Sequence, residues 1–123
     1  GYFMFGFPEE THATMNDTIN FAIESNLNLA KLSILTPLPG TKKFEEWDKK
    51  GLIKSKDWSL YNTHKPDKVY THPNLKWRDI YFYYRKFYRK FYLRPSFIFS
   101  RFKQSIINRT IISDMNVFLK TKF

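Results

Sequence analysis

The sequence opens with two short apolar runs, each ended by a proline and followed by a helical pattern. The first run is YFMFGF at residues 2–7, before Pro8, and the second is LAKLSILT at residues 29–36, before Pro37. Between the runs, apolar residues recur every three or four positions, as on one face of a helix: Met15, Ile19, Ala22, Ile23 and Leu27. Two consecutive strand–helix units with short connections predict parallel strands joined by right-handed crossovers. We therefore expect an α/β fold, either a doubly wound sheet or a barrel.

The predicted two-strand sheet is too small to stand alone. Strands that are apolar on both faces need neighbours on both edges. The chain begins at Gly1, with neither an initiator methionine nor a basic targeting segment before the first apolar run. We expect the chain to be a fragment whose first partner is the missing N-terminal part of the same polypeptide.

Composition excludes several classes of protein. The 123 residues are 42% hydrophobic and 26% charged, as in a single globular domain. Because there is no cysteine, the chain has no disulfide, no thiolate metal site and no thiolate ligand for an iron–sulfur cluster. His12, His64 and His72 show no repeated ligand spacing, so no metal-binding residue is predicted.

A long helix with one aromatic and one basic face is predicted from Trp77 to Arg94. It carries much of the net charge of +10, which results from 21 basic and 11 acidic residues. Three interpretations are open: an aromatic face packed in the core, a helix lying on an anionic membrane, and a helix that binds single-stranded nucleic acid. Nucleic acid is the least expected, since bases usually stack on sheets or loops.

The sequence divides into three parts. Residues 1–51 contain the two strand–helix units, the second ending with a short helix from Thr41 to Gly51. Residues 52–74 show no sustained period and are interpreted as a connecting segment, anchored by Trp58, Leu60 and Tyr61. Residues 75–123 form a helical extension, with shorter helices predicted over 97–108 and 111–119.

The two loops that follow the strands are the candidate site. In parallel α/β folds the loops at the carboxyl ends of the strands form the binding site, and here they span residues 6–11 and 36–41. Each loop has a glycine that would let the backbone approach a ligand. A tight turn would need the same glycines and prolines without any ligand, so this second interpretation remains open.

Four segments resemble the C-terminal half of radical S-adenosylmethionine (SAM) enzymes, most closely the group with a cobalamin-binding domain. The segments are GYFMFGFPEET, LSILTPLPGT, DWSLY and FYYRKFYRKFYLRPSF. In that family the fifth strand ends in G-x-P-G-E-T, matched here by Gly6, Pro8, Glu10 and Thr11. The sixth ends in P-x-P-G-T, matched here by Pro37, Pro39, Gly40 and Thr41. Glu9 stands where the family usually has glycine.

The resemblance implies that residues 1–51 are the last two βα units of a partial (β/α) radical SAM barrel, followed by a mainly helical extension. The cysteine loop that holds the 4Fe-4S cluster would lie upstream of Gly1, so this chain alone should be inactive. Six residues would belong to the wall against which SAM lies: Phe5, Gly6, Glu10, Leu35, Thr36 and Pro37.

The implied activity of the complete enzyme is reductive cleavage of SAM by the 4Fe-4S cluster, with cobalamin as a candidate further cofactor for methyl transfer or ring chemistry. A small-molecule or lipid-like substrate, a cytoplasmic location with peripheral membrane contact, and no nucleic acid partner go with this expectation. The alternative is a non-catalytic basic module that binds a membrane surface or nucleic acid through the 77–94 helix.

Overall fold

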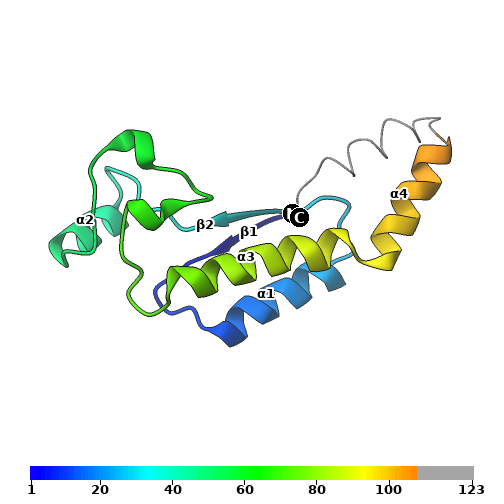
Figure 1. Cartoon of the computed structure of the whole chain (residues 1–123), viewed down its shortest axis with the longest axis horizontal. Helices are drawn as coiled ribbons and strands as arrows, with labels where there is room; N and C mark the ends of the chain where they lie inside the picture. The colour runs from blue at the N-terminus through cyan, green and yellow to red at the C-terminus, as the bar shows by residue number, and fades with distance from the viewer. Residues whose placement is uncertain (108–123) are drawn as a thin grey trace.

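The computed structural model describes residues 1–107 as a two-stranded parallel sheet with helices on one side (Figure 1). The predicted helix over 111–119 lies outside the described residues. In chain order the elements are β1 (Tyr2–Phe5), α1 (His12–Glu24), β2 (Lys31–Ile34), α2 (Lys42–Lys49), two 3₁₀ turns, η1 (Trp58–Leu60) and η2 (Pro66–Lys68), α3 (Trp77–Tyr92) and α4 (Pro95–Ile107).

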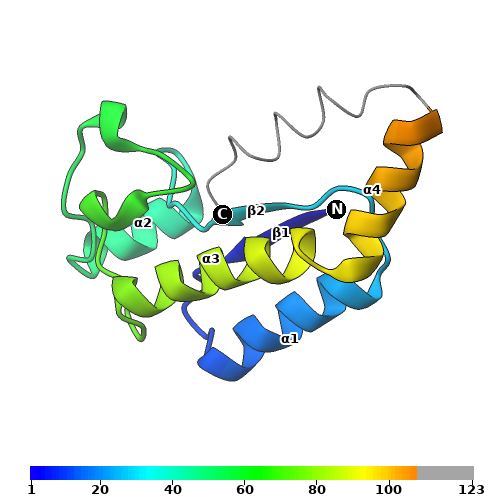
Figure 2. The same cartoon turned by 45° about the vertical axis from the view of Figure 1, so that its right-hand side comes forward.

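The two strands pair in parallel through the α1 crossover, with Tyr2 opposite Lys31 and Phe5 opposite Ile34. Helices α1 and α3 lie side by side against the sheet (Figures 1 and 2). Because side chains alternate along a strand, Phe5 enters the core beneath these helices, while Tyr2 and Met4 are exposed on the other side. The sequence predicted strands buried on both faces, whereas the described residues cover only one face of the sheet.

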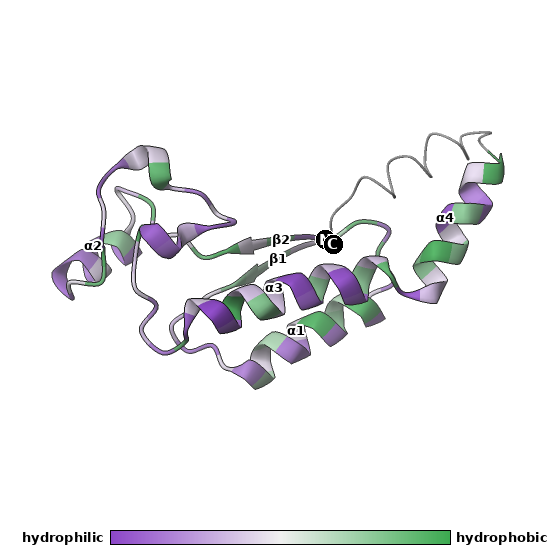
Figure 3. Ribbon diagram, in the orientation of Figure 1, coloured by the Kyte–Doolittle hydropathy of each residue, from purple (hydrophilic) through white to green (hydrophobic). Residues whose placement is uncertain are grey.

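The main core lies between the sheet and helices α1 and α3. Its buried residues come from β1, α1, β2 and α3, together with Ala30 just before β2: Phe5, Met15, Ile19, Ala22, Ala30, Leu32, Tyr83, Phe87 and Phe91. The aromatic face of the 77–94 helix therefore packs in the core, as the first of the three interpretations holds. Its basic face is turned outward (Figure 3).

The outer edge of β2 is covered by tyrosine hydroxyls and not by another strand. The Tyr92 hydroxyl lies 2.8 Å from the Ala30 carbonyl and 3.2 Å from the Ala30 amide. The Tyr88 hydroxyl bonds both backbone groups of Leu32 in the same way, and the Ile34 amide donates to the Thr63 carbonyl. The sequence predicted a neighbouring strand on each edge of the sheet, but the outer edge of β2 needs none, because these groups already occupy its backbone.

The connecting segment folds around a second, smaller core. Val69 and Tyr70 are fully buried with Trp47 of α2, and the Trp47 and Tyr70 ring centroids are 4.8 Å apart. A single bridge pairs Ile53 with Tyr70. Of the three predicted anchors, Leu60 and Tyr61 pack against this core, whereas Trp58 is half-exposed. The division at residues 51 and 74 stays a prediction.

Candidate functional site

The loops after β1 and β2 meet at one end of the sheet. The Leu35 amide donates to the Phe5 carbonyl at 2.7 Å, which extends the strand pairing into both loops. All six residues predicted for the SAM wall lie at this end, because the carboxyl ends of parallel strands share one edge.

Gly6 occupies a position that only glycine fits well. Its φ of +90° lies in the left-handed region, which a side chain disfavours. A Cβ atom there would also lie 3.1 Å from Ile34 Cγ2 and 3.5 Å from the Tyr70 hydroxyl oxygen. Packing within the chain is therefore one sufficient reason for glycine at this position.

Glu10 closes the first loop back onto β1. Its Oε2 atom accepts the Gly6 amide and, at 3.3 Å, the Phe7 amide. The side chain is buried, and this burial raises the pKa of the Glu10 carboxyl although both hydrogen bonds act in the opposite direction. The acid thus fixes the loop, and α1 starts next to it with Thr11 as its N-cap.

The second loop begins with two buried residues, Thr36 and Pro37. The Thr36 hydroxyl donates to the Ile34 carbonyl at 3.1 Å, and Pro37 is fully buried. Phe5 likewise has its ring in the core, 6.2 Å from that of Phe87. The large apolar side chains that these loops expose are Phe7 and Leu38, so these two residues are the additional candidates for ligand contact.

Two residues that sequence reasoning missed hold the loops in place. The Tyr70 hydroxyl donates to the Leu35 carbonyl at 2.6 Å, and burial raises the pKa of Tyr70, so the hydroxyl stays a donor. His72 Nε2 lies 3.2 Å from the Phe7 carbonyl oxygen. The only signal in the sequence is the apolar pair of Val69 and Tyr70 beside a His-Pro step.

The three histidines lie in different places. His72 braces the loop after β1, His64 lies 3.0 Å from the Tyr84 hydroxyl, and His12 lies near Asp79 at 4.0 Å. Within residues 1–107, no group of three or more His, Asp or Glu residues could hold a metal ion. In the same range, no helix has the length and apolar character needed to cross a membrane.

Comparison with known proteins finds methyltransferases. The chain is 36% identical over 95 residues to an uncharacterized methyltransferase of Pyrococcus horikoshii, which covers 77% of this chain and 20% of that protein. It is 36% identical over 64 residues to the bacteriochlorophyllide d C-12(1)-methyltransferase of Chlorobaculum tepidum, covering 52% of this chain and 14% of the relative. The C-8(2)-methyltransferase of the same organism is 31% identical over 62 residues, with 50% and 14% covered.

The chain thus spans a fifth or less of the length of these relatives. No family model matches it, and no solved structure matches it. The sequence resemblance assigned the chain to the radical SAM group with a cobalamin-binding domain, and these findings show that this assignment is wrong. The relatives are named only as methyltransferases. An iron–sulfur cluster and cobalamin have no support in these names.

Proposed function

We propose that this chain is a segment of a SAM-dependent methyltransferase, in which the loops 6–11 and 36–41 line part of the SAM site. The observation that carries this proposal is the similarity to three proteins named methyltransferases. SAM is the methyl donor that such an enzyme would use, and the complete protein would supply the remaining residues of the site.

The geometry of the loops supports this role. Their backbones are fixed from behind by Glu10, Tyr70 and His72, so the ligand-facing surface is ordered before a ligand arrives. The exposed side chains of Phe7 and Leu38 can cover the apolar face of an adenine ring. The proposed role of the six wall residues is therefore to position SAM through the loop backbone, and no residue of this chain is proposed to react.

The open edge of the sheet supports a larger fold. The backbone groups of Gly1 and Phe5 pair with β2, so those of Tyr2 and Met4 face the opposite edge of β1. Within the described residues no strand covers that edge, whereas tyrosine hydroxyls cover the outer edge of β2. We propose that further parallel strands join at β1 to form a (β/α) barrel or open sheet with β2 as its last strand.

The proposal is tested by SAM binding to the complete protein, measured by calorimetry. We expect Gly6→Val to weaken SAM binding at least about tenfold, because the new side chain pushes the two loops apart. Gly51→Val is the matched control: its φ of +67° is also left-handed, but a Cβ atom there meets nothing within 4 Å. Wild-type SAM affinity in a folded Gly6→Val variant would overturn the proposed site.

A second pair of variants covers the case in which Gly6→Val does not fold. Phe7→Ser and Leu38→Ser change exposed side chains and should leave the fold intact. Both should weaken SAM binding several-fold, whereas Phe21→Ser, which changes an exposed ring on α1, should not. Equal affinity in all three variants would contradict the proposal.

A further inference from the structure

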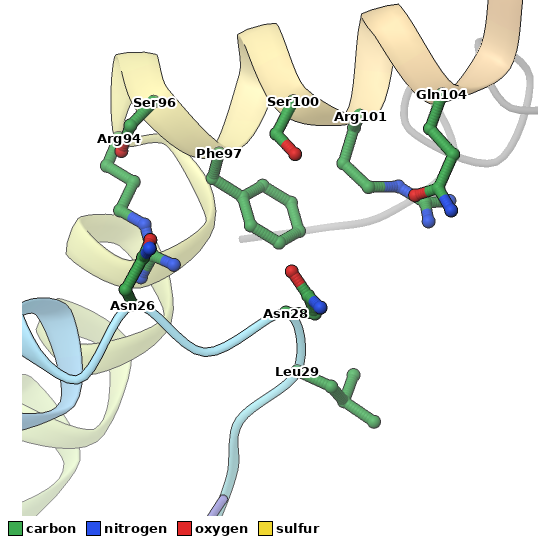
Figure 4. A pocket seen from close by; sticks show the side chains of 9 residues that line it. All are labelled: Asn26, Asn28, Leu29, Arg94, Ser96, Phe97, Ser100, Arg101 and Gln104. Carbon is green, nitrogen blue, oxygen red and sulfur yellow. The ribbon is translucent and has the colours of Figure 1, made fainter. Parts of the chain in front are cut away.

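Helix α4 turns its polar side toward the rest of the described chain. Phe97, Ser100, Arg101 and Gln104 follow one face of α4, and they line a cavity of about 380 Å³ opposite the loop from Asn26 to Leu29 (Figure 4). Apart from the Phe97 ring, the α4 side chains on this face are polar. In a surface helix of a globular protein the apolar side normally faces inward.

The apolar side of α4 is exposed. It comprises Ile98 (43% exposed), Phe99 (72%), Phe102 (56%) and Ile106 (51%). These residues share one face at helical spacing, and α4 projects away from the sheet (Figure 1). The apolar face of α4 therefore points outward and its polar face inward, which marks the apolar face as a contact surface.

The charge of the segment that contains α4 has one sign. Seven Lys and Arg residues and no Asp or Glu lie between Ile80 and Ile107. Lys103 is exposed on α4, and Arg85, Arg89 and Lys90 are exposed on α3. An apolar helical face in a segment rich in cations is the composition of helices that lie in the interface of an anionic membrane.

Other occupants fit this surface less well. A second copy of the chain would bring its own excess of cations against these, which costs association energy. Nucleic acid would match the charge, but the aliphatic Ile98 and Ile106 offer no ring on which a base stacks. We propose that α4 lies in the headgroup region of an anionic bilayer, with Phe99 and Phe102 inserted and the cations at the lipid phosphates.

This inference is independent of the proposed function and concerns where the protein works. The test is co-sedimentation of the complete protein with vesicles of phosphatidylcholine, with and without phosphatidylserine, at low and high salt. We expect binding to the phosphatidylserine vesicles that weakens as salt rises, and weak binding to phosphatidylcholine alone.

The deciding variant replaces both exposed rings, Phe99→Ser and Phe102→Ser. It should reduce vesicle binding at least about tenfold, because two apolar side chains no longer leave water. Phe21→Ser removes an exposed ring from α1 and should bind vesicles like the wild type. The double variant should keep its SAM affinity, so failure of this inference and failure of the proposed SAM site can be told apart.

Three results would overturn the inference. One is unchanged vesicle binding in the double variant. Another is a change of oligomeric state in the double variant without any vesicle binding by the wild type, which would assign the face to a second copy. The third is strong hydrogen-exchange protection of residues 98–106 in the complete protein without vesicles, which would show that another part of the polypeptide covers α4.

Discussion

The Nε2 atom of His72 lies 3.2 Å from the carbonyl oxygen of Phe7, across 65 residues of sequence. On the other side of the ring, Nδ1 accepts the amides of Asn74 at 3.2 Å and Leu75 at 2.9 Å. A nitrogen that accepts N–H groups carries no proton, so the imidazole is neutral and Nε2 donates to Phe7. His72 thus ties the loop after β1 to the chain that leads into α3.

Removing this imidazole should loosen the first loop. In His72→Leu, the Phe7 carbonyl and two amides lose their partner in a mostly buried place, which we expect to cost about 2–4 kcal/mol of local stability. Hydrogen exchange of residues 6–11, followed by mass spectrometry, measures this loss. His12→Leu, at an exposed position, should change the same exchange by less than about 0.5 kcal/mol. Equal protection in both variants would contradict the bracing role.

Because His72 can titrate, we also expect the stability of the first loop to depend on pH. Burial lowers the pKa of His72 below its ordinary value of 6.5, so the unfolded state binds a proton more readily than the folded state. Its contribution to stability is complete above pH 6.5 and decreases as the pH falls from 6.5 through the folded-state pKa. We expect the hydrogen-exchange protection of residues 6–11, corrected for the intrinsic dependence of exchange on pH, to fall in that window. His72→Gln, which does not titrate, should remove this part of the dependence.

For Glu10 we expect a dependence of stability on pH with the opposite sign. Burial raises the pKa of Glu10 above its ordinary value of 4.5, so the folded state favours the protonated acid. The corresponding stability is present below pH 4.5 and is lost as the pH rises through the folded-state pKa. Glu10→Gln should therefore lack this loss while still accepting the Gly6 amide. Denaturant unfolding of both proteins at a series of pH values compares them, and parallel curves would refute the expectation.

The strand–helix units could be predicted because their signals are local. Residues within β1 and β2 form apolar runs, and Met15, Ile19 and Ala22 recur at helical spacing and are buried as expected. The meeting of the two loops also follows, since parallel strands place their carboxyl ends together. The strands are shorter than the apolar runs, because Gly6 and Thr36 already belong to the loops.

The parts that hold the loops could not be predicted, because they depend on contacts between distant residues. Tyr70 reaches Leu35 and His72 reaches Phe7 from a segment without any periodicity. The covering of the β2 edge by Tyr88 and Tyr92 likewise depends on the angle at which α3 crosses the sheet. The six wall residues lie where β1 and β2 end and in the loops that follow, but a loop pattern gives no indication that Thr36 and Pro37 are buried.

Phe87 should be a principal stabilising residue of the core. Its ring is fully buried and lies 5.4 Å from that of Phe3 and 6.0 Å from that of Phe91. Phe87→Ala leaves a cavity between α3 and the sheet, so we expect a loss of about 3–5 kcal/mol in the free energy of unfolding. Phe82→Ala, half-exposed on the opposite face of α3, should cost less than about 1 kcal/mol. Chemical denaturation of both variants measures the difference, and similar losses would place the core elsewhere.

Tyr70 provides the sharpest test of the link between loop geometry and ligand binding. Tyr70→Phe keeps the ring packed against Trp47 but removes the donor that holds the Leu35 carbonyl. Leaving that carbonyl unpaired should cost about 1–2 kcal/mol of local stability in the second loop. If this loop lines the SAM site, SAM affinity should fall by up to about tenfold, because part of the binding energy must then order the loop.

Tyr61→Phe is the control for this prediction. Its hydroxyl also donates to a backbone carbonyl, that of Ser55 at 2.9 Å, but it does so within the connecting segment. Both variants lose one tyrosine hydroxyl bond to the backbone, so a general loss of stability would affect SAM binding equally in both. Calorimetric titration with SAM should find wild-type affinity for Tyr61→Phe and weakened affinity for Tyr70→Phe. Wild-type affinity for Tyr70→Phe, together with faster hydrogen exchange in residues 35–38, would mean that the second loop can loosen without any effect on SAM and therefore does not contact it.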